Sequence, residues 1–578
     1  MSAAAGGTPA ALSARELMAR FPSGLALEDF TSFHRSLEIR LSRAYWRKRG
    51  GQAFLEREVP NDITNDGTRA ARAAEVLFAN CIEVDASGGG GPIRVLELGV
   101  GMGLFARLVL RRFRELCGAH GKDFYSRLTY HATDYSEQNL LDIQRLGTLD
   151  DFEDHVRLSV VDATAPAQFT PLGRTSAKPW VGGFRAVFHN YLYDALPTSM
   201  VLRQEGRWYE LRIQARLSEP WRVEELSGLS FDALLDLLRR GDDASVDALV
   251  PLYSFINAER SFFPVELDQL PYGDEVRRFA DEVLQPWIDE AVGPQRNLRM
   301  WVPWGGMTSF SNTAPLLEPH GFMLMTDYGS TRVADVTGAR AYQRYGAGVC
   351  VNVNFVLLEQ FVRQRGFEIC AAEGDDDLPL HGRLFTRASL AQTRARFQET
   401  FAAGDFETLE SHLTEARALV QKDHVKALEH YYAAVQVCPH NWRTLAELAH
   451  VENAHAERHD RALELIDQAL ALNPTCSSDL WSERGDILVI LGQLEEAERA
   501  YQRGVTLNPS HSRSHYNLAW LWAEMGRFVE ALEACGRALA TDRTGEASET
   551  ILAKQRDILA RRREAYDAER ERVLLRHA

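Results

Sequence analysis

Hydrophobic and polar positions follow two different patterns along the chain, and the change falls near residue 400. Before it, short apolar runs that end in glycine or polar residues predict buried strands alternating with amphipathic helices, as in an α/β domain. After it, apolar residues recur at helical spacing in paired segments. We therefore expect a tail and helix over 1–40, an α/β domain over 41–400 and a helical region from 401 onward.

Apolar runs in the first part of the chain predict the strands of the sheet, and polar residues follow four of them. These four runs lie at 95–98, 130–133, 158–161 and 186–188, and further strand signals lie at 321–329 and 349–355. Parallel strands of such a sheet end at one edge, where open α/β sheets bind their ligands. The polar residues after the four strands are therefore expected in register at that edge.

The segments around these strands predict helices and one hairpin. Helices are expected at 27–49, 68–83, 226–249 and 274–292, and a hairpin is expected over 201–217 with its turn at Glu205-Gly206-Arg207. The last two helices belong to an insertion over about 214–300. This insertion is long enough to cover a ligand at the sheet edge, so we expect it to form a cap.

A glycine turn joins the first predicted strand to a helix, in the sequence Val-Leu-Glu-Leu-Gly-Val-Gly-Met-Gly at 95–103. Gly99, Gly101 and Gly103 let the backbone turn tightly and let a ligand approach. Such a corner can hold the pyrophosphate of a dinucleotide. However, the carboxylate of Glu97, just before the glycines, would repel a pyrophosphate and attract the cationic amino-acid end of S-adenosylmethionine. This donor is therefore favoured over a dinucleotide, and an empty relic of the site is the third reading.

This order of residues resembles the class I methyltransferases, which have a Rossmann-like α/β fold. The resemblance implies that Glu97 and the glycines face the methionine moiety, that Asp134 binds the ribose hydroxyls and that Asp162 with Ala163 lies at the adenine. The residues expected to bind S-adenosylmethionine are Glu97, Gly99, Gly101, Gly103, Asp134, Tyr135, Asp162, Ala163 and Asn190.

Four further motifs, in this order, carry a closer resemblance, which covers about residues 41–400. They are Asn190-x-x-x-Asp194-Ala195-Leu196-Pro197, Trp208-x-Glu210, Thr326-Asp327-Tyr328-Gly329 and Val351-Asn352-Val353-Asn354-Phe355. Together they resemble the MidA family, class I methyltransferases that include the mitochondrial complex I assembly factor. The resemblance implies methylation of a protein arginine at a terminal guanidino nitrogen, or an assembly role of unknown chemistry.

The chain departs from the MidA pattern at two places. Tyr191 follows the motif asparagine where the family has an acid, and no Pro-Glu-Ile-Ser segment occurs near 61–69. The remaining pair, Asn190 and Asp194, suits the chemistry, because the carboxylate of Asp194 can bind a guanidinium and accept its proton. Asp194 and Asn190 are the candidate catalytic residues. The candidate substrate-binding residues are Tyr191, Tyr193, Glu210, Asp327, Asn352 and Asn354.

Five of these candidates also have a structural interpretation. Asp194 would be a suitable cap for a helix that begins at Ala195-Leu196-Pro197. Asn352 and Asn354 fit solvent-facing positions of an alternating strand. Tyr191 and Tyr193 could line an acceptor channel or belong to the core.

Composition and charge narrow the partners. A net charge of −16 and a pI near 5.6 disfavour nucleic acid, which needs clustered Lys and Arg. The seven cysteines have no paired spacing, which favours reduced thiols in a cytoplasmic setting over disulfides or a metal site. No run approaches the ~20 apolar residues that cross a bilayer. We expect no membrane segment and no secretory signal in the Ala- and Gly-rich stretch at 1–13.

From about Phe406 the chain repeats with a period close to the ~34 residues of tetratricopeptide repeats. The recurring segments are Lys426-Ala427-Leu428-Glu429, Arg461-Ala462-Leu463-Glu464, Glu496-Ala497-Glu498-Arg499 and Glu530-Ala531-Leu532-Glu533. Pro439, Pro474 and Pro509 follow at one phase, and Ala434, Ala469 and Ala538 occupy the small-residue position. We therefore expect a repeat superhelix over 401–545, whose concave surface binds a protein or peptide. A charged helix over 546–578 would cap it or bind a partner.

Three hypotheses for function follow. The first is an S-adenosylmethionine-dependent methyltransferase of a protein or peptide, most plausibly at arginine, with the repeats recruiting the substrate. The second is an assembly or binding protein that works through its repeats, which Tyr191 in place of an acid favours. The third, a small-molecule acceptor, is disfavoured because a free metabolite would not require repeats. The sequence leaves the oligomeric state open.

Overall fold

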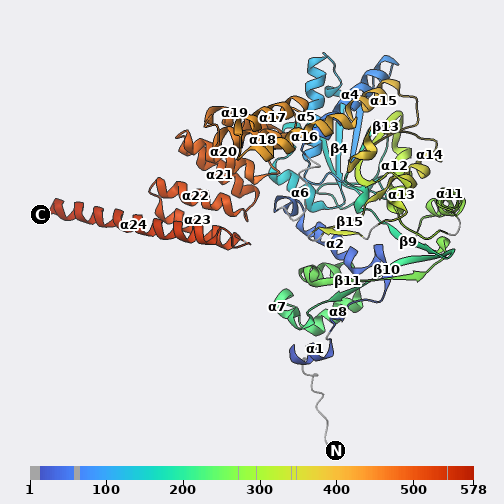
Figure 1. Cartoon of the computed structure of the whole chain (residues 1–578), viewed down its shortest axis with the longest axis horizontal. Helices are drawn as coiled ribbons and strands as arrows, with labels where there is room; N and C mark the ends of the chain where they lie inside the picture. Colours follow the sequence, from blue (N-terminus) through green and yellow to red (C-terminus); the bar gives the residue numbers. More distant parts are fainter. Residues whose placement is uncertain are drawn as a thin grey trace, which may run out of the picture.

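The computed structural model describes most of the chain as one α/β part followed by helical hairpins (Figure 1). The described residues are 14–21, 23–56, 66–270, 272–293, 296–339, 342–345, 348–542 and 544–577. The predicted tail at 1–13 and residues 57–65 lie outside this range. No helix among the described residues has the length and apolar character needed to span a bilayer.

A sheet with five parallel neighbouring strands forms the centre of the α/β part. Its order is β17-β18-β13-β8-β3-β4-β5-β6-β7, and β18 and β17 run antiparallel at one side. The parallel strands are β3 (Ile93–Leu98), β4 (Leu128–Asp134), β5 (Val156–Val160), β8 (Phe184–Asn190) and β13 (Leu317–Ser330). The others are β6 (Gln168–Pro171), β7 (Lys178–Pro179), β17 (Glu368–Cys370) and β18 (Leu380–Thr386). The sequence-predicted strands at 95–98, 130–133, 158–161, 186–188 and 321–329 all lie in this sheet.

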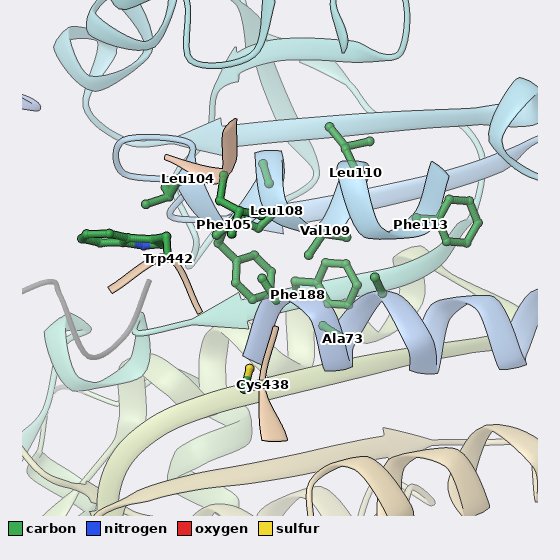
Figure 2. Packing of buried hydrophobic residues seen from close by; sticks show 14 of the residues in the cluster. Ala73, Leu104, Phe105, Leu108, Val109, Leu110, Phe113, Phe188, Cys438 and Trp442 are labelled. Carbon is green, nitrogen blue, oxygen red and sulfur yellow. The ribbon is translucent and has the colours of Figure 1, made fainter. Parts of the chain in front are cut away.

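Helices cover both faces of the central sheet because each presents an apolar stripe. On one face lie α4 (Thr68–Ala86) and α5 (Leu104–Ala119). Leu104, Leu108 and Phe113 of α5 pack toward the sheet around Phe188 (Figure 2). On the other face lie α12 (Trp304–Thr313) and α14 (Phe355–Arg363). Burying these stripes supplies most of the drive for the fold.

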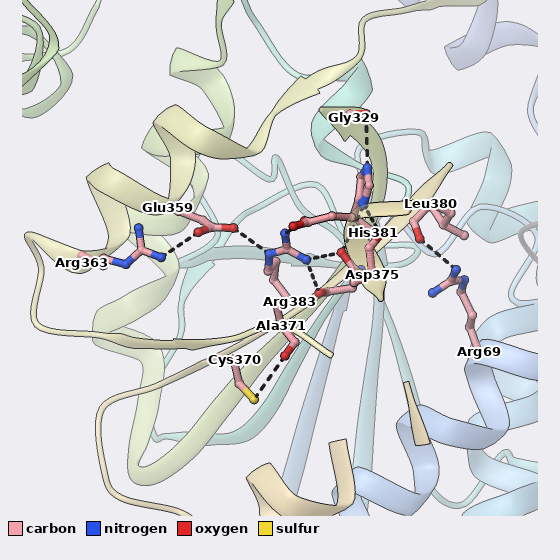
Figure 3. Close-up of polar contacts among 12 residues, drawn as sticks. Arg69, Gly329, Glu359, Arg363, Cys370, Ala371, Asp375, Leu380, His381 and Arg383 are labelled. Carbon is pink, nitrogen blue, oxygen red and sulfur yellow. Dashed lines mark hydrogen bonds and ion pairs between the residues drawn. The ribbon is translucent and has the colours of Figure 1, made fainter. Parts of the chain in front are cut away.

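A buried ion network ties the antiparallel side of the sheet together (Figure 3). Arg383 of β18 is 2% exposed and pairs with both Asp375 and Glu359, while His381 contacts the same Asp375 through its Nδ1 at 3.1 Å. The guanidinium beside Asp375 and the hydrogen bond from His381 hold the pKa of this carboxyl below its ordinary value, although burial alone would raise it. Every charge in this network has a partner, as a structural role requires.

A second sheet forms partly from the insertion and partly from segments before it. The predicted hairpin forms from β9 (Ser199–Gln204) and β10 (Arg207–Leu217), with Arg207 opposite Gln204. Helices α8 (Phe231–Arg240), α9 (Asp243–Leu249), α10 (Asp274–Phe279) and α11 (Gln285–Ala291) lie in the predicted helical segments. The strands β11 (Ile256–Pro264) and β12 (Leu298–Val302) were not predicted. β11 has little apolar alternation, and its pairing along the length of β10 stabilises it.

Two predicted elements begin or end elsewhere. The helix predicted over 27–49 starts only at Leu37, as α2 (Leu37–Arg49), because β1 (Leu25–Ala26) and β2 (Thr31–Ser32) pair with β10 instead. The carboxylate of Glu28 accepts the Leu37 N–H and fixes this boundary. The strand predicted over 349–355 is broken into β15 (Gly348–Cys350) and β16 (Val353–Asn354), and α14 then begins.

Helical hairpins follow the α/β part and agree with the predicted repeats. Their helices are α16 (Ala403–Leu419), α17 (His424–Val437), α18 (Trp442–Ala454), α19 (His459–Leu472), α20 (Ser478–Ile490), α21 (Leu494–Leu507), α22 (Ser512–Glu524) and α23 (Phe528–Thr541). The small positions Ala434, Ala469 and Ala538 are fully buried. The charged stretch forms α24 (Ser548–His577), whose Ile551 and Ile558 pack on the last hairpin before the helix extends outward (Figure 1).

Candidate functional site

The carboxyl ends of the five parallel strands bring most of the candidate residues to one edge of the central sheet. Glu97 and the glycines follow β3, Asp134 ends β4 and Asp162 follows β5. Asn190 ends β8, and Asp327 lies near the end of β13 beside it. We call this region the sheet edge.

The glycine turn adopts the conformation that its sequence predicts. Gly99 and Gly101 both have a positive φ, +78° and +55°, which residues with a side chain rarely adopt. A Cβ at Gly99 would lie 3.2 Å from the side chain of Leu192. The loop therefore comes close to the segment after β8, and the N–H groups of Gly99 and Val100 are bonded to the carbonyl of Thr133 at the end of β4.

Asp134 holds the glycine turn through its buried carboxylate. Its Oδ2 accepts the N–H of Gly101 at 3.0 Å and its Oδ1 accepts that of Ser136 at 2.9 Å. Burial raises the pKa of this carboxyl, and these hydrogen bonds act against the rise. Tyr135 is 42% exposed, and its hydroxyl donates to the backbone carbonyl of Arg43 on α2.

Glu97 is buried within the sheet rather than open to solvent. The hydroxyl of Tyr130 donates to its Oε2 at 2.7 Å. Burial, together with the charge of Asp134, raises the pKa of Glu97 to about 8. A cation held against this carboxyl would favour its charged form and lower the pKa again.

The adenine-side candidates lie at the end of β5. Ala163 is buried, while Asp162 is exposed and accepts hydrogen bonds from the backbone N–H and the hydroxyl of Thr164. Burial lowers the pKa of the Arg43 guanidinium on α2, and the negative charge of the nearby Asp162 acts against this change. Helix α2 therefore borders the sheet edge, which the sequence did not predict.

Asp327 organises the motif segment after β8. Its Oδ2 accepts the backbone N–H groups of Leu192, Tyr193 and Asp194 at 3.2, 2.8 and 3.3 Å. Its Oδ1 accepts the N–H of Tyr328. These bonds fix the turn that carries Asp194, so the buried Asp327 positions the segment and does not reach outward.

Asp194 is partly buried beside Asp327 and the thiol of Cys350. Burial raises its pKa to about 6, while the hydrogen bond with Cys350 lowers it. The alternative of a helix cap finds no helix at this place, because a single 3₁₀ turn (Tyr193–Ala195) leads directly into β9. Asn190 accepts a hydrogen bond from the Thr326 hydroxyl at 2.6 Å, which orients its amide at the same edge.

The remaining substrate candidates are dispersed. Tyr193 is buried against Gly306, and Tyr191 lies 5.4 Å from the ring of Tyr328. Asn354 is buried and engaged as a helix cap, since its Oδ1 accepts the Leu357 N–H and its Nδ2 donates to Trp301.

Two substrate candidates lie away from the strand ends that carry Asp194. Asn352 is exposed, as the alternating-strand reading expected. Glu210 lies on β10 of the second sheet.

Sequence reasoning missed several residues of the site. Tyr130 could have been found from strand register, because it lies opposite Val95 and two residues from the position paired with Glu97. Cys350 and Arg43 come from distant segments, and nothing in their local sequence indicates the contact. Among the described residues, no group of three or more His, Cys, Asp or Glu side chains is placed to hold a metal ion.

The repeats dock directly onto the elements around the glycine turn. Three successive loops between helical hairpins carry the contacts: Asn441 donates to Asp66, Thr475 bonds Thr148 at 2.9 Å, and Asn508 donates to the carbonyl of Leu55. An apolar cluster joins Met102 of the glycine turn to Leu55, Leu146 and the repeat residue Leu507. Figure 2 also places the repeat residue Trp442 beside Leu104, at the start of α5.

Comparison with known proteins agrees with this two-part organisation. A profile of the family described as "putative S-adenosyl-L-methionine-dependent methyltransferase" matches residues 76–369, and a tetratricopeptide repeat profile matches residues 482–546. The chain is 36% identical over 81 residues to a peroxisomal targeting signal receptor of Candida glabrata, covering 14% of each chain. It is 34% identical over 86 residues to the human protein O-mannosyl-transferase TMTC1, covering 14% of this chain and 10% of that protein.

These curated relatives are thus matched over only about a seventh of their length or less. Among solved structures, MamA is similar at 19% identity with a TM-score of 0.23, covering 29% of this chain and 95% of that one. The methyltransferase profile, in contrast, spans just over half of the 578 residues. The protein therefore belongs to this MidA-like family of S-adenosylmethionine-dependent methyltransferases and carries tetratricopeptide repeats after the family domain.

Proposed function

We propose that the protein methylates a terminal guanidino nitrogen of arginine in a protein or peptide, and that its repeats recruit this substrate. The observation that carries the proposal is the position of Asp194. Its carboxylate lies at the sheet edge, on a turn fixed by Asp327, and its pKa is raised to about 6. A base with such a pKa is mostly ionised at neutral pH and still able to take up a proton.

The residues at the sheet edge fit S-adenosylmethionine. The turn at Gly99 and Gly101 has the positive-φ backbone of such a corner, and Glu97 offers a buried carboxyl for an ammonium group. Asp134 would take the ribose hydroxyls, and Asp162 with Ala163 would border the adenine. The strand order of the central sheet supports the Rossmann-like class I assignment, because its parallel strands change direction of progression between β3 and β8. When bound, the donor supplies an electrophilic methyl group on a sulfonium.

The protein's own groups then have to hold and deprotonate the acceptor. A guanidinium is protonated at neutral pH and cannot attack without losing a proton. The Asp194 carboxylate pairs with the guanidinium and accepts the N–H proton as the nitrogen gains its methyl group. Asn190, oriented by Thr326, supplies a further polar contact at the same edge. Positioning of this kind accounts for much of the rate of such transfers.

We also propose the domain limits expected from the sequence, with the methyltransferase domain at about 41–400 and the repeats at 401–545, in a cytoplasmic protein. An assembly role is the second candidate. Tyr191 in place of the family acid favours it, because one carboxylate fewer weakens guanidinium binding more than donor binding.

Calorimetric titration with S-adenosylmethionine and S-adenosylhomocysteine, followed by labelled donor and host lysate, tests the proposal. We expect donor binding and a labelled protein whose hydrolysate contains methylarginine, and an Asp194→Asn variant that binds the donor but labels nothing. Donor binding with no labelled product, in lysate or with arginine peptides, would favour the assembly role. A hydrolysate with methyl groups on another residue would refute arginine as the acceptor.

A further inference from the structure

Four buried polar side chains gather between the second sheet and the start of α12 without hydrogen-bond partners. Within the described part of the chain, the unpartnered atoms are His34 Nδ1, Glu210 Oε1, Tyr272 OH and Trp304 Nε1. His34, Glu210 and Tyr272 are 8%, 2% and 3% exposed, and Trp304 is half-buried. We call these four residues the cap cluster.

Three of these side chains are neighbours through their rings although they come from distant segments, and the charge of the fourth, Glu210, acts on Tyr272. The ring of Trp304 lies 4.9 Å from that of His34, nearly perpendicular to it, and 6.3 Å from that of Tyr272. Burial and the nearby charge of Glu210 raise the pKa of Tyr272. The other carboxylate oxygen of Glu210 pairs with Arg212 at 3.4 Å, which leaves Oε1 free.

Such a group of unpaired atoms is costly to a folded protein. A buried donor or acceptor without a partner costs about 1–3 kcal/mol, and native proteins retain few of them. The buried network around Arg383 makes the contrast, because its charged groups are paired with one another (Figure 3). A ligand that supplied the missing partners would remove this cost when it bound.

The chemistry of the cap cluster fits a planar cation. The carboxylate of Glu210, whose charge acts on Tyr272, offers charge pairing, and the rings of Tyr272 and Trp304 offer cation–π attraction. Guanidinium groups use both well. Burial, and the charges of Arg35 and Arg43, lower the pKa of His34 to about 4, so its ring is neutral and Nδ1 can accept an N–H. The indole N–H of Trp304 remains as a donor for a peptide carbonyl.

The cap cluster adjoins the sheet edge through two connections. The backbone N–H of Gly305, next to Trp304, donates to the carbonyl of Pro197 at 2.7 Å, at the end of the Asp194 motif. Arg43, whose charge acts on His34, is the residue of α2 that lies near Asp162. The cap cluster and the motif that carries Asp194 therefore belong to adjoining segments of the fold.

We propose that His34, Glu210, Tyr272 and Trp304 form a specificity subsite for a second arginine side chain of the acceptor peptide. This inference rests on the proposed function for the identity of the acceptor. The subsite recognises a guanidinium through the carboxylate of Glu210 and does not take part in the transfer. It gives the enzyme a preference for substrates with two arginines close together.

Fluorine NMR of protein labelled with 5-fluorotryptophan reads the subsite directly. The chain has 11 tryptophans, so Trp304→Phe identifies one resonance and the others report on folding. With S-adenosylhomocysteine present, N-acetyl-arginine amide should shift the Trp304 resonance saturably, and the neutral citrulline analogue should not. Glu210→Gln should raise the dissociation constant at least tenfold. Asp194→Asn should leave it unchanged, as should Glu259→Gln, which alters a more exposed carboxylate on the adjacent strand β11.

Two outcomes would overturn the subsite: no shift of the Trp304 resonance with the arginine probe, or a Glu210→Gln variant that titrates like the wild type. If Glu210→Gln fails to fold, His34→Phe keeps the ring contact with Trp304 and removes only the acceptor, and it should weaken binding as well. A normal Trp304 shift in a protein that transfers no methyl group would refute the proposed function and leave the subsite standing. Arginine methylation by a protein whose Glu210→Gln variant titrates like the wild type would refute the subsite and leave the proposed function standing.

Discussion

The sheet edge and the cap cluster differ in how their buried polar groups are paired. At the sheet edge, the carboxylates of Asp134 and Asp327 accept two and four backbone N–H groups, respectively. In the cap cluster, four polar atoms have no partner among the described residues. The first arrangement fixes loops in advance of any ligand, and the second leaves recognition groups free to meet one.

This difference distinguishes two kinds of residue by their hydrogen bonds and not by their motifs. Positioning residues use their polar atoms within the protein, and recognition residues leave polar atoms unpaired. Asp327 belongs to a family motif, yet its oxygens are used within the protein. Glu210 also belongs to a motif, and one of its oxygens is unused. Substitutions should therefore have different consequences in the two regions.

The largest effect is expected at Asp194, the proposed base for the acceptor. Asp194→Asn should reduce methyl transfer at least about a hundredfold, the low end for loss of a general base, with unchanged affinity for S-adenosylhomocysteine. Because the pKa of Asp194 is raised to about 6, the wild-type rate should fall as pH drops below 6 and the carboxylate takes up a proton. Single-turnover rates between pH 5 and 8 measure this. Asp236→Asn, an exposed carboxylate on α8, serves as the control. Equal loss of donor binding and turnover would assign Asp194 a structural role.

Asp327→Ala should destabilise the fold more than changes in the cap cluster do. The substitution leaves backbone N–H groups of the 192–194 turn unpaired, at about 1–3 kcal/mol for the first of them. Asp327→Asn keeps one oxygen acceptor and should lose less. Urea unfolding midpoints of the two variants measure the effect. Identical midpoints for Asp327→Ala and wild type would show that the turn does not depend on this carboxylate.

Asp134→Ala should act on the donor and also on the fold, because its carboxylate accepts the N–H groups of Gly101 and Ser136. Loss of a charged hydrogen bond to the ribose should weaken donor binding by about 1.5–3 kcal/mol, measured by calorimetric titration. The Trp304 resonance should still respond to N-acetyl-arginine amide, because the cap cluster does not depend on Asp134. Unchanged donor affinity would contradict the assignment of Asp134 to the ribose.

The smallest effects compare two buried tyrosines. Tyr130→Phe removes the hydroxyl that donates to Glu97, so we expect a loss of about 1–3 kcal/mol in stability. Tyr272→Phe removes a hydroxyl without a partner, and its unfolding midpoint should equal or exceed that of the wild type. Thermal or urea unfolding midpoints of both variants, measured in parallel with the wild type, test this difference. Equal losses of stability in the two variants would mean that the hydroxyls of Tyr130 and Tyr272 do not differ in their pairing.

The sequence predicted what depends on local pattern. The glycine turn, the strand ends and the repeat period each follow from residues close together in the chain, and all appear where expected. The sequence could not predict β11 or the late start of α2, because pairing with β10 decides both.

The cap cluster is beyond local patterns for the same reason. Its residues lie at positions 34, 210, 272 and 304, and only the second sheet and α12 bring them together. Only Glu210 carried a motif that drew attention to it. Asp134 was found because it ends a strand, where chain order alone indicates the site, and Asp194 was found through the motif that begins at the end of β8.

The docking of the repeats limits how many of them the protein can carry. Tetratricopeptide arrays commonly gain and lose units, because each unit contacts only its neighbours. Here Asn441, Thr475 and Asn508, in successive loops, contact three separate points of the methyltransferase part. Inserting or deleting a unit between them would carry Leu507 away from Met102 and the glycine turn. The copy number up to that loop is therefore set by these contacts with the methyltransferase part, and the array is free to lengthen only beyond it.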